Sequence, residues 1–135
     1  MSAETVAVVR AIYSAFAAGD VPAALGAMSP GIVWHEAEHH PYADGSPYVG
    51  PEAVAAGVFA RCGEEWEGFA AVPDEILDAG DTVVALGRYT AAAYRATGRR
   101  LNAQMVHVWR VEGGKAVAFQ QYTDTLAFAH ALGTA

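Results

Sequence analysis

The first apolar pattern along the chain is helical. Between residues 3 and 18 the hydrophobic positions recur every three or four residues, namely Val6, Val9, Ile12, Tyr13 and Phe16. This spacing predicts an amphipathic helix with one buried face. Gly19 ends this helix, and Asp20 is placed to cap a second, short helix that runs to about Met28. A third helix is predicted from Pro51 to about Glu65.

The rest of the chain has the composition of strands. A short strand is predicted over residues 32–36, after a turn at residues 29–31 and before a loop over residues 38–50. Further strands are expected at residues 69–77, 82–94, 100–111 and 115–122, and a closing helix at residues 125–132. Because glycine-bearing turns separate these later strands, they are predicted to form an antiparallel meander.

This order of elements predicts the fold class. Helices that precede a meander are typical of α+β folds, and 135 residues suit a single domain over 1–135. Met105, His107 and Trp109 alternate with Val106 and Val108, so the strand that holds them is apolar on both faces. Such a strand needs two covers. The helices supply one, and a second copy of the chain is expected to supply the other, as in a homodimer.

Composition and charge limit the kinds of partner that the chain is expected to bind. A net charge of −7 disfavours nucleic acid and an anionic membrane surface, since both require clustered lysine and arginine. The sequence has no recognisable signal peptide and no apolar run of bilayer length, so a cytoplasmic location is expected. The single cysteine, Cys62, excludes an internal disulfide and is expected to be a packed, inert thiol.

The densest group of polar side chains is His-Glu-Ala-Glu-His-His at residues 35–40. On a strand, Trp34 and Glu36 share one face, and His35 points the other way. Neighbouring residues of a strand or loop diverge, and no helical pair of histidines is present, so no metal site is predicted. His39 is instead expected at the mouth of a pocket. The loop over 38–50 is expected to be an ordered but adjustable lid beside that mouth.

Several strings resemble those of a known superfamily, the one that contains nuclear transport factor 2, ketosteroid isomerase and the SnoaL-like polyketide cyclases. The strings are IYSAFAAGD at 12–20, IVW at 32–34, YVGPEAV at 48–54, LDAGDTVV at 77–84 and HVWRVEGGK at 107–115. Their joint order covers nearly the whole chain. The resemblance implies a cone-shaped, curved antiparallel sheet, an α+β barrel, with the N-terminal helices packed on it around an internal pocket.

The resemblance also implies roles for individual residues. Glu36 falls where ketosteroid isomerase carries its carboxylate base, and His107 falls near that enzyme's buried acidic donor. The isomerase's first-helix tyrosine maps to Ile12, and Tyr13 lies one residue later, about 100° round the helix. In SnoaL-like cyclases an acidic residue occupies the position of Gln121. Asp124, three residues on, is a substitute catalytic acid or the cap of the closing helix.

Three hypotheses for function follow. The first is a cofactor-independent enzyme in which Glu36 removes a proton beside the carbonyl of a small or polycyclic compound and His107 donates to the oxyanion. Such an enzyme would be an isomerase, a cyclase or a dehydratase. The second is a non-catalytic small-molecule-binding or dimerisation module, and the third is water activation of the epoxide-hydrolase type. The residues expected to contact a ligand are Tyr13, Trp34, His39, Phe59, Tyr89, Trp109, Gln121 and Tyr122.

Overall fold

A computed structural model describes residues 2–135 of the chain. Its first two helices are α1, Ser2–Ala17, and α2, Val21–Gly26, close to the predicted ranges. Asp20 caps α2 as expected, because its side chain accepts a hydrogen bond from the backbone N–H of Ala23 at 3.1 Å. The second helix is shorter than predicted, since Met28 already belongs to the first strand.

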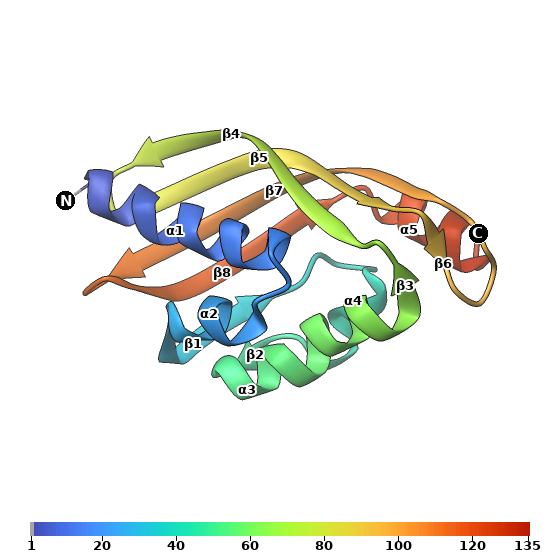
Figure 1. Ribbon diagram of the computed structural model, residues 1–135, viewed down its shortest axis with the longest axis horizontal. Coiled ribbons are helices and arrows are strands. Elements are labelled where there is room, and N and C mark those ends of the chain that lie inside the picture. The colour runs from blue at the N-terminus through green and yellow to red at the C-terminus, as the bar shows by residue number, and fades with distance from the viewer. Residues whose placement is uncertain (1) are drawn as a thin grey trace.

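Six strands form one sheet in the order β2-β1-β8-β7-β5-β4 (Figure 1). Their bounds are β1 Met28–His35, β2 Tyr48–Val49, β4 Ala70–Ala79, β5 Thr82–Ala91, β7 Leu101–Glu112 and β8 Lys115–Thr123. The predicted antiparallel meander is confirmed from β4 to β8, whereas β1 and β8 pair in parallel. Because β2 and β4 are edges of this sheet, it is a curved, open half-shell and not a closed barrel.

Two boundaries differ from the sequence prediction. The turn expected at residues 29–31 lies inside β1, where the pairing with β8 jumps from Met28↔Ala116 to Val33↔Ala118. A bulge therefore absorbs the turn-forming residues without ending the strand. The strand expected to reach Tyr94 stops at Ala91, and the next two residues of extended chain, β6 (Ala93–Tyr94), pair with β3 (Trp66–Glu67) in a separate small sheet.

The third predicted helix is continuous but not uniform. It consists of α3, Pro51–Val54, a π-helical segment, Ala55–Phe59, and α4, Ala60–Glu65. The wider turn lies where Val58 and Phe59 face a cavity, in keeping with the frequent occurrence of π-helical turns at functional sites. Gly57 is required in this segment, since a Cβ atom there would lie 2.1 Å from the Tyr48 ring. The loop before this helix is ordered into a 3₁₀ helix, Pro41–Gly45, and β2.

The helices lie on one face of the sheet (Figure 1). Between them and the sheet, an aromatic cluster forms much of the core, and the rings of Trp34 on β1 and Phe119 on β8 stack 3.7 Å apart. The closing helix α5, Thr125–Leu132, adds Phe128, which is fully buried. No helix among residues 2–135 has the length and hydrophobicity needed to cross a bilayer.

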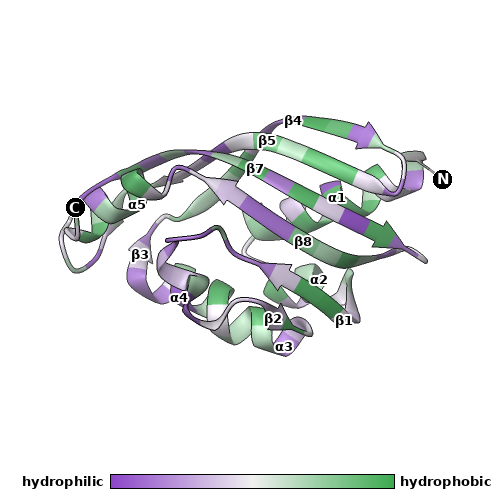
Figure 2. Cartoon of the chain, turned by 180° about the vertical axis from the view of Figure 1, so that it is seen from behind, coloured by the Kyte–Doolittle hydropathy of each residue, from purple (hydrophilic) through white to green (hydrophobic). Residues whose placement is uncertain are grey.

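The opposite face of the sheet has no helical cover (Figure 2). Leu86, Val106 and Tyr122 lie side by side across β5, β7 and β8 on this face, and Tyr122 is 57% exposed. The row places apolar surface on three neighbouring strands. This arrangement is what the sequence pattern of doubly apolar strands predicted, and it leaves room for a second copy of the chain.

We propose that the chain forms a homodimer through this row. Light scattering should then give a mass of about twice 14.1 kDa. A charge in the middle of the row, Val106→Glu, should yield a monomer because an unpaired carboxylate would have to be buried in the interface. Val49→Glu is the control, since Val49 is 62% exposed on the edge strand β2. A wild-type monomer at every concentration would contradict the proposal.

Candidate active site

The main cavity lies between the concave face of the sheet and the helices, with a volume of about 410 Å³. Its wall is largely aromatic, and it is in the size range of small-molecule sites. Seven of the residues predicted from sequence to form a site line it, namely Trp34, Glu36, Phe59, Tyr89, His107, Trp109 and Gln121. The fold therefore brings together residues from β1, the helix after it, β5, β7 and β8. Their roles stay predictions.

Glu36 follows directly after β1 and is only 6% exposed. Its Oε2 atom accepts a hydrogen bond from the indole N–H of Trp34 at 2.9 Å, and its backbone N–H donates to Ser46 Oγ at 3.0 Å. The other carboxyl oxygen, Oε1, is buried and has no hydrogen-bond partner among residues 2–135. Burial raises the pKa of Glu36 to about 7, against the smaller opposing effects of the Trp34 hydrogen bond and the Arg61 charge.

His40 lies next to this carboxyl group. Its Nδ1 atom is 3.5 Å from Glu36 Oε1 and accepts a hydrogen bond from the backbone N–H of Tyr42 at 3.0 Å. Burial lowers the pKa of His40 to about 3, so the ring is neutral. Because Nδ1 accepts, the single ring proton resides on Nε2. That nitrogen is buried and has no partner.

His107 stands at the centre of a chain of buried hydrogen bonds. Its Nδ1 lies 2.5 Å from the hydroxyl of Tyr13, and its Nε2 lies 2.5 Å from the hydroxyl of Tyr89. The indole of Trp109 donates to the Tyr13 hydroxyl at 3.0 Å, and the Gln121 amide donates to the Tyr89 hydroxyl at 2.7 Å. Burial lowers the pKa of His107 to about 3, so one ring nitrogen donates and the other accepts.

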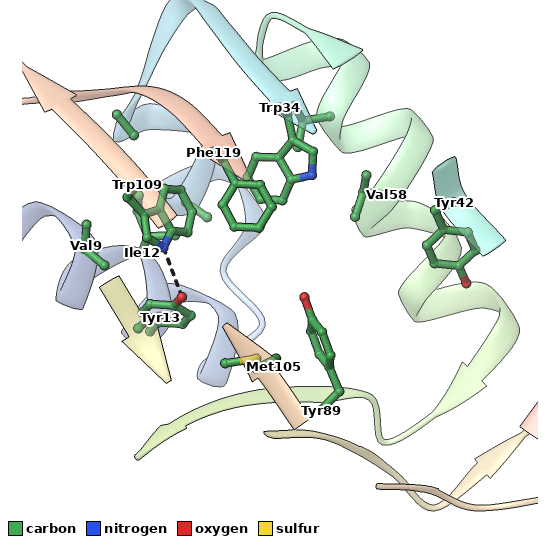
Figure 3. Close-up of a cluster of buried hydrophobic side chains, with 14 of the residues drawn as sticks. Val9, Ile12, Tyr13, Trp34, Tyr42, Val58, Tyr89, Met105, Trp109 and Phe119 are labelled. Carbon is green, nitrogen blue, oxygen red and sulfur yellow. Dashed lines mark hydrogen bonds between the residues drawn. The ribbon is translucent and has the colours of Figure 1, made fainter. Parts of the chain in front are cut away.

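The direction of these bonds follows from the surroundings of Tyr13. Its buried hydroxyl does not reach the cavity, and among the described residues His107 Nδ1 is the acceptor available to it. Tyr13 therefore donates to Nδ1, and the proton on Nε2 of His107 is donated to Tyr89. The Tyr89 oxygen then accepts from both His107 and Gln121, which leaves its own O–H proton for the cavity. Figure 3 shows this hydroxyl directed toward the space beside Trp34, Phe119 and Val58.

This order corrects the predicted role of His107. Both of its ring nitrogens are already engaged by tyrosine hydroxyls, so it has no N–H with which to bind a ligand oxygen. The group that faces the cavity as a donor is Tyr89. His107 is hydrogen-bonded to the Tyr89 hydroxyl, and Tyr13, predicted to contact the ligand, lies on the other side of His107 and is hydrogen-bonded to its Nδ1.

Three other predicted site residues lie outside the cavity. Asp124 is exposed and caps α5, since its side chain accepts from the N–H of Ala127 at 3.2 Å, which is the capping alternative. Tyr122 faces the outer side of the sheet because side chains alternate along β8 and Gln121 points inward. His39 is exposed in a left-handed conformation, φ +67°, and it is His40 that lines the cavity.

The sequence prediction also missed residues of the cavity wall, and His40 and Tyr42 are two of them. His40 was within the histidine cluster, but the regular alternation of β1 ends before it, so no periodicity distinguishes it from His39. Tyr42 lines the cavity from the 3₁₀ helix, which means that the predicted lid loop contributes to the wall of the cavity. Whether the loop adjusts its position stays a prediction.

Thiol and metal chemistry receive no structural support. Burial raises the pKa of the Cys62 thiol, which keeps it protonated. Among residues 2–135, no three His, Cys, Asp or Glu side chains are grouped as a metal site would require. The predicted absence of a bound metal stays a prediction that elemental analysis of the purified protein can test.

The raised pKa of Glu36 predicts a pH-dependent stability. The carboxyl ionises near pH 4.5 in the unfolded chain but only near pH 7 in the folded one, so wild-type stability falls as pH rises through this window. The amide of the variant Glu36→Gln does not titrate. The substitution should therefore raise the free energy of unfolding by about 2 kcal/mol more at pH 8 than at pH 5. Urea denaturation at the two pH values measures this difference. Glu38→Gln, at an exposed position, is the control, and an equal gain at both pH values would refute the expectation.

Comparison with solved structures identifies similar folds. An NTF2-like protein from Burkholderia thailandensis E264 shares 39% identity with a TM-score of 0.90, over 95% of this chain and 96% of that one. An NTF2-like protein of unknown function from Burkholderia pseudomallei K96243 shares 30% identity with a TM-score of 0.84, over 95% and 96%. TerC, crystallised with polyporic acid, shares 25% identity with a TM-score of 0.84, over 96% and 98%.

Family comparison gives the same placement. No curated protein matches the sequence significantly. A family model described as the SnoaL-like domain matches residues 9–119, which include α2, the whole sheet except the end of β8, and most of the cavity wall. The resemblance seen in the short sequence strings is thereby confirmed. The chain belongs to the SnoaL-like family and has the fold of the NTF2-like proteins.

Proposed function

We propose that the protein is a cofactor-independent enzyme that removes a proton from a carbon atom beside the carbonyl group of a small or polycyclic compound. The observation that carries the proposal is the carboxyl group of Glu36. It is buried in a largely aromatic cavity, one of its oxygens has no partner, and its pKa is about 7. A general base of this pKa is half ionised near neutral pH, where it both accepts a proton and returns it.

Tyr89 supplies the second requirement, a donor for the negative charge that develops on the carbonyl oxygen. Its hydroxyl oxygen accepts hydrogen bonds from His107 and Gln121, and its own proton is free for the ligand. Burial raises the pKa of Tyr89 well above 10, so it donates a hydrogen bond without losing the proton. The fixed partners behind it keep the donor in place before the substrate binds.

Proton removal at carbon is the shared first step of isomerisation, aldol-type cyclisation and dehydration. The carbanion formed beside the carbonyl is stabilised as an enolate, and later steps depend on the substrate. Family membership supports this range, since SnoaL-like proteins include polyketide cyclases. The co-crystallisation of TerC with polyporic acid supports a small organic compound as the ligand.

Water activation of the epoxide-hydrolase type is less compatible with the contacts. It requires a carboxylate, an amide and a tyrosine that converge on one water molecule, and Glu36, Gln121 and Tyr89 do line one cavity. However, the Gln121 oxygen already accepts from the backbone N–H of Ala37 at 3.0 Å, and its nitrogen donates to Tyr89. One acceptor direction of the amide oxygen and one N–H of the amide are thus used within the protein, so Gln121 is held as a structural link and not as a dedicated water ligand.

Hydrogen–deuterium exchange at carbon tests the proposal without knowledge of the natural substrate. The protein should accelerate the exchange of the acidic C–H protons of 2-tetralone in D₂O, followed by proton NMR. Glu36→Gln should abolish the acceleration because an amide cannot accept the proton. Tyr89→Phe should lower the rate by about a hundredfold, the scale of losing one oxyanion donor. Tyr122→Phe, at an outward-facing tyrosine, is the control and should leave the rate unchanged.

The exchange rate should also depend on pH in one direction. It should rise about tenfold per pH unit below pH 7 as Glu36 ionises, and level off above pH 7. Other titratable groups near Glu36 do not interfere, because burial lowers the pKa of His40 to about 3 and raises those of Cys62 and Tyr89. If Glu36→Gln exchanged protons as fast as the wild type, the cavity would be better explained as a non-catalytic binding site.

A further inference from the structure

Two polar side-chain atoms are buried without a partner among the residues that the structure describes, and they are neighbours in the same cavity. They are Oε1 of Glu36 and Nε2 of His40. An unpaired polar atom in a buried position costs about 1–3 kcal/mol, so native structures rarely contain two of them together. Their proximity to each other and to the cavity indicates that a ligand group supplies what both lack.

The two atoms do not satisfy each other. The nearest approach is between Glu36 Oε1 and His40 Nδ1, at 3.5 Å. The lone pair of Nδ1 is already directed at the backbone N–H of Tyr42, so Nδ1 carries no proton to give to the carboxylate. The proton of His40 resides on Nε2, at the other side of the ring. The pair therefore has one unpaired acceptor, Oε1, and one unpaired donor, Nε2–H, on two residues that line the cavity.

Both side chains are fixed in these orientations. The second carboxyl oxygen of Glu36 is held by the Trp34 indole at 2.9 Å. The His40 ring packs against Phe128, with ring centroids 4.4 Å apart. The positive charge of Arg61 lowers the pKa of both Glu36 and His40. Its guanidinium group pairs with Asp44 at 2.7 Å and does not contact the Glu36 carboxylate directly. The acceptor and the donor are thus preorganised, and neither can turn away to find a partner in the protein.

We propose that Glu36 and His40 together form a binding subsite for a hydroxyl group. A hydroxyl is the simple oxygen group that accepts a hydrogen bond from Nε2–H while it donates one to a carboxylate. A ketone or ether oxygen would satisfy His40 alone, and an ammonium group would satisfy Glu36 alone. The bond to the ionised carboxylate is charge-assisted and therefore the stronger of the two.

This subsite adds a substrate class to the proposed function. That substrate class rests on the proposed function. A carboxylate oxygen has two lone-pair directions, so Oε1 can hold a hydroxyl and still face a C–H bond. The substrate class is then a carbonyl compound that also carries a hydroxyl or enol group near the carbon that loses its proton. Its carbonyl oxygen would bind Tyr89, and its hydroxyl would bind Glu36 and His40.

The test compares two inert probes, 2-naphthol and 2-methoxynaphthalene, by isothermal titration calorimetry at pH 8. Both are bicyclic, and both oxygens accept from His40, but the methyl ether cannot donate to Glu36. Wild-type protein should bind 2-naphthol about tenfold more tightly, the scale of one charge-assisted hydrogen bond. Equal affinities, or no measurable binding of either probe, would overturn the subsite.

Substitutions of Glu36 and His40 then test the part that each side chain plays in binding the two probes. His40→Asn keeps a side-chain oxygen that accepts from the N–H of Tyr42, two residues on, but withdraws Nε2–H. Glu36→Gln removes the charge and keeps the shape. Glu36→Gln should reduce the preference for 2-naphthol to about twofold or less. His40→Asn should instead weaken the binding of both probes to a similar extent, because both oxygens accept from Nε2–H. His39→Asn is the matched control, since His39 is exposed with a positive φ that asparagine tolerates, and it should keep the full preference.

A spectroscopic measurement makes the result independent of variant folding. In protein labelled with ¹⁵N-histidine, the His40 ring should show its proton on Nε2, and 2-naphthol should shift that resonance more than 2-methoxynaphthalene does. A proton on Nδ1, a preference that persists in Glu36→Gln, or unchanged affinities in His40→Asn would overturn the subsite. Such a failure is separable from the proposed function, because 2-tetralone carries no hydroxyl group and its proton exchange could still depend on Glu36.

Discussion

The constraint on which the site depends is that polar groups in an apolar cavity must be paired within the protein. Trp109, Tyr13, His107, Tyr89 and Gln121 meet this constraint with one continuous chain of hydrogen bonds. Because each member has a partner, the direction of every proton in the chain is determined. The chain ends at the Tyr89 hydroxyl, whose proton is left over for the cavity. The order of these bonds thus locates a ligand-facing donor that no single residue type would indicate.

Sheet topology decides which groups meet. The parallel pairing of β1 with β8 brings the end of β1 next to Gln121, which accepts from the N–H of Ala37 and donates to Tyr89. Gln121 therefore connects the part of the chain that carries Glu36 with the hydrogen-bonded chain around His107. The same pairing stacks Trp34 on Phe119, and the Trp34 indole in turn orients the Glu36 carboxyl group. The pairing of β1 with β8 thus orients the Glu36 carboxyl group and brings Gln121 to the Tyr89 hydroxyl.

The raised pKa of Glu36 and the lowered pKa of His40 have a common origin in burial. Desolvation disfavours the charged form of both, so near neutral pH the site holds a partly ionised carboxyl group beside a neutral imidazole. A buried carboxyl group without a full set of hydrogen-bond partners lowers the free energy of unfolding. Functional sites commonly lower the stability of the folded state in this way. The aromatic wall that surrounds the two groups maintains this condition by excluding water.

The sequence alone predicted the helices and the antiparallel meander, because these follow from local periodicity and turn residues. The resemblance of its short strings to a known superfamily gave the family and, with the strand pattern, seven of the residues that line the cavity. The sequence also placed Glu36 on the same side of the extended chain as Trp34, since alternation along such a segment is local. It could not distinguish His40 from His39, nor assign Asp124 to capping instead of catalysis, because both lie where regular alternation ends. The partners of His107 come from α1 and β5, 94 and 18 residues away along the chain. Only tertiary contacts at such separations decide which nitrogen donates and which hydroxyl is left to face the ligand.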